Sequence, residues 1–136
     1  MKKLKVSAAV FTAALVSTPC LSMEWNTEFS KMMNEQLQQY VGVSVNEYTV
    51  IQSASMTHNS FNNTLVKRSS YRVSLPSSDY DLSALKSSVK ESDLQDCNDP
   101  RMQELVSAFS NVNYQVFKSF YFFSDGKELT IETSCE

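Results

Sequence analysis

The stretch VNYQVFKSFYFFSDGKELTIETSC (Val112–Cys135) decides the fold. Its first half, Val112 to Phe123, is rich in aromatic and β-branched residues, which favours a strand. Asp125-Gly126 is the preferred pair for a two-residue type I′ turn, and residues 127–135 can return as a second strand. The sequence therefore predicts a C-terminal β-hairpin.

A two-residue turn at Asp125-Gly126 pairs Ser124 with Lys127 and so fixes the register of the hairpin. This register predicts a core face that carries Val112, Tyr114, Val116, Phe120, Phe122, Leu129, Ile131 and Cys135. The opposite, outer face then carries three aromatic residues: Phe117, Tyr121 and Phe123. Either another element, such as the first helix, covers these aromatic residues, or they are candidate partner-binding residues.

A short amphipathic helix is predicted just before the hairpin. Asp99 is a good N-cap, and Pro100 occupies the first helical position, where a missing N–H costs nothing. Apolar residues then follow at helical spacing: Met102, Leu105, Val106 and Phe109. Since Cys97 precedes this helix and the predicted register turns Cys135 toward it, a Cys97–Cys135 disulfide is expected to join the helix start to the last strand.

The rest of the chain contains two further helices and two further strands. Their expected ranges are a helix over 26–40, strands over 43–56 and 65–75, and a helix from about 81 to 94. The order is then α-β-β-α-α-β-β. We expect an α+β fold with a single antiparallel sheet of four or five strands flanked by helices, closed by one disulfide.

The N-terminus has the pattern of a secretory signal peptide. Three lysines, Lys2, Lys3 and Lys5, precede an apolar run over 6–16 that is too short to span a bilayer. We expect a signal peptide over 1–22, a mature single domain over 23–136 and a periplasmic location. Lipidation at Cys20 is the alternative, but Pro19 stands where lipoprotein signals have a small residue.

Loss of the signal peptide would leave Cys97 and Cys135 as the two cysteines, which in an exported chain predicts a disulfide. It would also leave 9 basic against 15 acidic residues, a formal charge of −6. An acidic chain without a basic stripe does not favour nucleic acid as a partner, and no stable membrane insertion of the mature chain is expected.

Residues that could carry catalysis are scarce. The one histidine, His58, is expected in a polar connection, without a second histidine or a free thiolate to form a zinc site. No glycine-rich phosphate loop occurs, and the neighbouring acids are typical of solvated surfaces. The sequence thus predicts a protein that is not an enzyme and that has no cofactor and no metal.

Residues Asp81 to Cys135 resemble a pattern of small Gram-negative periplasmic proteins and lipoproteins. The pattern consists of a leucine-rich helix, Cys97-Asn98-Asp99-Pro100, an aromatic strand, Asp125-Gly126-Lys127 and a closing Cys135. The layout is similar to that of the β-type pilotins of type II secretion. This resemblance implies a sheet flanked by helices, a cysteine pair and a peptide-binding groove.

Two functions are therefore expected. The first is a non-catalytic periplasmic accessory protein that recognises another protein, such as a secretion or envelope-complex component. The alternative is a periplasmic immunity or inhibitor protein against a toxin such as a cell-wall hydrolase, because small acidic domains suit basic enzymes. A homodimer is compatible with either function.

Overall fold

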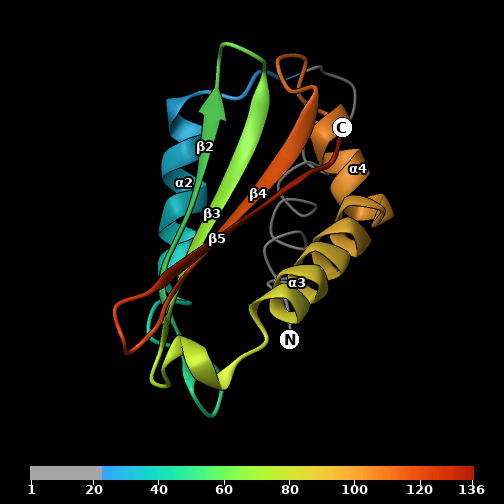
Figure 1. The fold of residues 1–136 in the computed structure, drawn as a ribbon. Helices are drawn as coiled ribbons and strands as arrows, with labels where there is room; N and C mark the ends of the chain where they lie inside the picture. Colours follow the sequence, from blue (N-terminus) through green and yellow to red (C-terminus); the bar gives the residue numbers. More distant parts are fainter. Residues whose placement is uncertain (1–22) are drawn as a thin grey trace.

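The computed structural model describes residues 23–136, so the predicted signal peptide and Cys20 lie outside the described residues. The expected α+β class is confirmed (Figure 1). The elements are α2 (Thr27–Gln38), β1 (Ser44–Asn46), β2 (Thr49–Asn59), β3 (Thr64–Val73), a short 3-10 helix (Ser77–Asp79), α3 (Leu82–Cys97), α4 (Pro100–Ser107), β4 (Tyr114–Phe122) and β5 (Glu128–Ser134). None of these helices has the length and apolar character needed to cross a membrane.

The strands form one five-stranded sheet in the order β1-β2-β3-β4-β5. We expected an antiparallel sheet, but the sheet is mixed. The strands β3 and β4 run parallel, while the other neighbouring strands are antiparallel. The cause is the connection between β3 and β4. It passes through α3 and α4, which carry the chain back to the end of the sheet where β3 began.

The helices α2, α3 and α4 pack on the same face of the sheet, which we call the inner face (Figure 1). One core cluster joins Met33 and Leu37 of α2 and Leu105 of α4 to Ala54 and Met56 of β2. A second cluster lies around α3, which contributes Val89. Its sheet members are Ile51, Tyr71, Val73, Tyr121 and Ile131. The opposite side of the sheet is called the outer face below.

Side-chain caps begin the helices, and the cap at Asp99 is the expected one. The side chain of Asn26 accepts a hydrogen bond from the backbone N–H of Phe29, and Asp81 accepts one from Ala84. Asp99 caps α4 in the same way, with Pro100 in the first turn. Each cap satisfies a backbone N–H that the helix itself leaves without a partner.

The turn between β4 and β5 differs from the prediction by one residue. Gly126 donates its backbone N–H to the carbonyl of Phe123 at 3.0 Å, and Phe123 donates to the carbonyl of Lys127 at 2.9 Å. The loop therefore has three residues, with Gly126 at a φ of +84°, as in a type I turn followed by a glycine bulge. Ser119 pairs with Ile131 and Phe117 with Thr133, one residue away from the predicted register.

This slip exchanges the two faces of β4. The predicted outer position of Phe117, Tyr121 and Phe123 is wrong, because these side chains lie on the inner face with exposed fractions of 6%, 3% and 5%. Tyr121 stacks on Tyr71 with ring centroids 4.7 Å apart. Conversely, four residues predicted for the core lie on the outer face: Tyr114, Val116, Phe120 and Phe122. Residues of β5 keep their predicted side, since Ile131 is fully buried.

Candidate functional site

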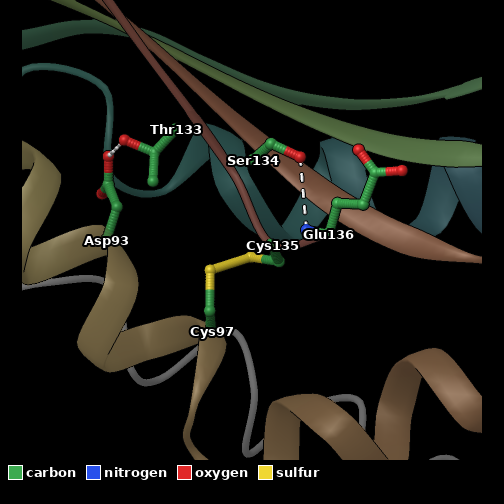
Figure 2. The surroundings of a disulfide bond; sticks show 6 residues. All are labelled: Asp93, Cys97, Thr133, Ser134, Cys135 and Glu136. Carbon is green, nitrogen blue, oxygen red and sulfur yellow. Dashed lines mark hydrogen bonds between the residues drawn. A yellow bond between two sulfur atoms is a disulfide. The ribbon is translucent and has the colours of Figure 1, made fainter.

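The disulfide joins the end of α3 to the residue that follows β5 (Figure 2). Cys97 and Cys135 are bonded, with their Cα atoms 5.4 Å apart, so the predicted pairing is confirmed. Cys135 also donates its backbone N–H to the carbonyl of Gln115 at 2.8 Å, which extends the β4–β5 ladder beyond the end of β5. The covalent bond and this hydrogen bond fix the corner where α3, β4 and the C-terminus meet.

A buried polar contact lies one turn of α3 away from the disulfide (Figure 2). The hydroxyl of Thr133 donates to a carboxylate oxygen of Asp93 at 3.1 Å, and both residues are buried. Tyr121 lies in the same region, where burial, with smaller contributions from Tyr71 and Asp93, raises the pKa of its phenol far above the usual range. Tyr121 therefore stays neutral and cannot act as a base at physiological pH.

A pocket of about 330 Å³ lies beside the disulfide, between α4 and the start of β4. Its apolar lining includes Met102, Val106 and Val112. Its polar lining consists of the neutral residues Asn98, Gln103, Ser107, Asn113, Tyr114 and Gln115. No charged side chain lines this pocket, so its chemistry suits a neutral ligand with hydrogen-bonding groups.

Gln115 is the residue in this pocket whose hydrogen bonding is incomplete. Its exposed fraction is 2%, and its side-chain Nε2 has no hydrogen-bond partner within the described residues. An amide nitrogen buried without an acceptor costs about 1–3 kcal/mol. Because Gln115 lines the pocket, a ligand with a carbonyl oxygen could supply the missing acceptor.

Sequence reasoning missed Gln115. In the predicted register it falls on the outer face, where a polar residue between Tyr114 and Val116 is ordinary. The register slip turns it inward, and the pocket around it is assembled from segments far apart in the chain. No local pattern in the sequence indicates this role.

The outer face of the sheet is a second surface of interest. Its apolar residues include Val66 and Val116, which are buried with exposed fractions of 6% and 8%, the half-buried Phe120, and Phe122 at the end of β4, which is 38% exposed. The charged residues on this face are Arg68 and Arg72 on β3, Lys118 on β4, and Glu128 and Glu132 on β5. Among the elements of residues 23–136, none packs on this face.

The expected position of His58 in a connecting loop is not what the structure shows. His58 is the tenth residue of β2, is half-buried, and its Nε2 lies 2.8 Å from the backbone carbonyl oxygen of Asn111. Within residues 23–136, no group of three or more potential metal ligands comes together. The contact between His58 and Asn111 thus joins β2 to the segment before β4.

No protein-family model, no curated protein and no solved structure matches this chain. The similarity in layout to β-type pilotins accordingly remains a prediction from the sequence.

Proposed function

We propose that this chain is an exported, non-catalytic binding protein that takes an extended segment of a partner protein into the pocket beside the disulfide. The observation that carries this proposal is Gln115, a residue that lines the pocket and whose buried side-chain Nε2 has no acceptor within the described residues. A backbone carbonyl of a bound segment would provide that acceptor.

The lining of the pocket favours a peptide over a charged small molecule. A charged group would lose its hydration on entering, and no lining side chain carries the opposite charge to compensate. Met102, Val106 and Val112 offer apolar contacts to side chains of the segment, and Asn98 and Asn113 can bond its backbone. The volume of about 330 Å³ is near the lower end of known ligand sites, roughly 300–1,000 Å³.

Export to the periplasm is part of the proposal. A disulfide persists in an oxidising compartment, and the N-terminal sequence has the charge and apolar run of a signal peptide. The pilotin-like layout, which implies a peptide-binding groove, supports a secretion or envelope component as the partner.

Replacement of Gln115 by leucine distinguishes an effect on partner binding from an effect on the stability of the fold. Gln115→Leu keeps the size of the side chain but removes the amide that lacks an acceptor, so we expect unchanged or increased thermal stability. If the amide binds a partner backbone, the same variant should lose at least tenfold in affinity for that partner. Equal binding by the wild type and Gln115→Leu would contradict the proposal.

The partner can be found by site-specific photo-crosslinking in the native envelope. A photoreactive amino acid at Ser107, which is exposed and lines the pocket, should crosslink the partner, and Gln115→Leu in the same chain should abolish the product. The matched control is the same amino acid at Ser87, an exposed serine on α3 outside the pocket. Identical products from both positions would exclude the pocket as the binding site.

A further inference from the structure

The charges of the outer face are sorted by strand. The arginines Arg68 and Arg72 stand on β3, the acids Glu128 and Glu132 stand on β5, and β4 lies between them with an apolar stripe. Across β3, β4 and β5, one side of the face is thus basic and the other side acidic, while Glu47 in the turn before β2 borders the same hollow as Arg72. Such a division is self-complementary if a second copy of the face is turned over onto the first.

The strand register places these charges at matching heights. Arg72 is paired with Phe122, and Phe122 with Glu128, so the three form one row across the sheet. Four residues further along each strand, a second row runs from Arg68 through Lys118 to Glu132. In both rows an arginine on β3 stands level with a glutamate on β5.

A two-fold axis that runs along β4 in the plane of contact brings opposite charges together. This rotation exchanges β3 and β5 and leaves every residue at its height, so Arg72 of one copy faces Glu128 of the other, and Arg68 faces Glu132. A two-fold axis across the strands would instead stack β3 on β3 and bring the arginines together. Charge complementarity therefore selects one arrangement of two copies.

The apolar stripe of β4 would lie on this axis. Phe122 would meet the Phe122 side chain of the second copy, and it borders a hollow of about 640 Å³ that is also lined by Tyr48, Val50 and Arg72. Aromatic rings at an interface prefer offset or edge-on contacts, which need such free space beside each ring. Lys118 also lies near the axis, and Glu132 is its cross-strand neighbour in the same chain, which offsets its charge.

We propose that two copies of this chain associate through their outer faces, in an aligned sandwich with an arginine ladder opposite a glutamate ladder. Packed sheets lie about 10 Å apart with their strand directions within about 30° of each other. The shared patch of three strands measures roughly 30 by 15 Å from the spacing and rise of strands, so the dimer should dissociate on dilution. The pocket beside the disulfide is not lined by Phe122 or by any of the four charged residues of the two ladders.

Charge reversal tests the arrangement directly. The protein is purified from the periplasm of an expressing host, and its mass is followed over a dilution series by analytical ultracentrifugation. We expect Arg72→Glu and Glu128→Arg each to raise the dissociation constant at least tenfold, because each places two pairs of like charges in contact. Lys86→Glu, at an exposed site on α3, serves as the control and should have no effect.

Mixing the two variants gives the decisive result. A heterodimer of Arg72→Glu with Glu128→Arg restores opposite charges at both contacts, and so does the homodimer of the double variant. Both should associate about as strongly as the wild type. Arg68→Glu and Glu132→Arg form an independent second pair that can be tested in the same way if one of the first variants fails to fold.

Three outcomes would overturn the proposal. The wild type could remain monomeric at the highest concentration reached, or the single reversals could leave the association unchanged. The mixture of folded single variants could also fail to associate, which would show that the two charges do not face each other across a two-fold axis.

Discussion

Asp125 connects two turns that are far apart in the sequence. One carboxylate oxygen accepts hydrogen bonds from the hydroxyl of Ser77 at 2.6 Å and from its backbone N–H at 3.1 Å. The other oxygen accepts from the backbone N–H of Lys127 at 3.2 Å. These bonds tie the β4–β5 turn to the 3-10 helix that follows β3.

The hydrogen bonds of Asp125 make the stability of this connection depend on pH. The Ser77 hydroxyl bond, followed by the backbone bonds, holds the pKa of the Asp125 carboxyl below its ordinary value despite some opposing desolvation. Because the folded pKa is the lower one, this stabilisation is complete above the unfolded pKa of about 3.9. It is lost as the pH falls through the folded pKa. We expect Asp125→Asn to flatten the fall in unfolding free energy over that acidic range.

The measurement is urea unfolding at a series of pH values, together with an NMR titration of the Asp125 carboxyl carbon. Ser77→Ala is the matched control, since it removes the main partner and should move the pKa back toward its ordinary value. Parallel stability curves for the wild type and Asp125→Asn would show that the Ser77 bond contributes nothing.

Single residues are predictable where the signal is local. The prediction of Asp99 as a helix cap is confirmed, because a cap acts on N–H groups only two or three residues away. Asp125-Gly126 does form the turn, but its type was mispredicted. A glycine with positive φ serves a two-residue type I′ turn as well as a glycine bulge, so these residues alone do not select the loop length.

At the scale of elements, the error of one residue in the length of the β4–β5 loop has a large consequence. The side chains of a strand alternate, so a slip of one residue moves every side chain of β4 to the other face. Hydrophobicity could not correct the error, because β4 offers large apolar residues on both faces. Phe117 and Tyr121 stand on one face, and Val116 and Phe120 stand on the other. The inner face of β4 packs against α3, whereas no described element packs on its outer face.

The parallel pairing of β3 with β4 also lies beyond what strand patterns reveal. The sequence correctly predicts that both segments are strands. Their relative direction, however, depends on the end of the sheet to which α3 and α4 return the chain. Two consecutive helices form a crossover long enough for a parallel connection. An antiparallel pairing would need the helices to return the chain to the end of the sheet where β3 finishes.

The contact between α3 and β5 gives a prediction at this scale. Thr133→Val replaces the hydroxyl that bonds Asp93 by a methyl group of similar size. We expect the free energy of unfolding to fall by about 1–3 kcal/mol, because a buried carboxylate loses a donor. Thr130→Val on the exposed side of the same strand should change it by less than about 0.5 kcal/mol. Equal effects of the two substitutions in urea unfolding would refute a stabilising role for this bond.

At the scale of the whole molecule, the proposed binding pocket depends on three separate parts of the chain. The junction of α3 and α4, the start of β4 and the C-terminus contribute to its lining, and both half-cystines are among the lining residues. The sequence predicted the disulfide, since two cysteines remain when the predicted signal peptide is left out and each stands beside a predicted element. It did not predict the pocket, because a cavity depends on the relative placement of all three parts.

The disulfide therefore connects stability with the proposed site. It spans 38 residues of sequence, and closing a loop of that length is expected to stabilise the fold by about 3–4 kcal/mol. The double variant Cys97→Ala/Cys135→Ala should lose this amount in urea unfolding, and reduction of the wild type should reproduce the loss. The variant itself should be insensitive to reductant, which is the internal control.

Hydrogen exchange would show where the molecule opens without the disulfide. The C-terminus then retains the single backbone bond from Cys135 to Gln115 at this corner, in contrast to the many ladder bonds within β4 and β5. We expect faster exchange at the last turn of α3, in α4 and at residue 135, with little change in β2 and β3. If the acceleration were spread evenly over the sheet, the disulfide would stabilise the fold as a whole without shaping the pocket. Peptide capture through Gln115 would then survive its removal at temperatures where the variant remains folded.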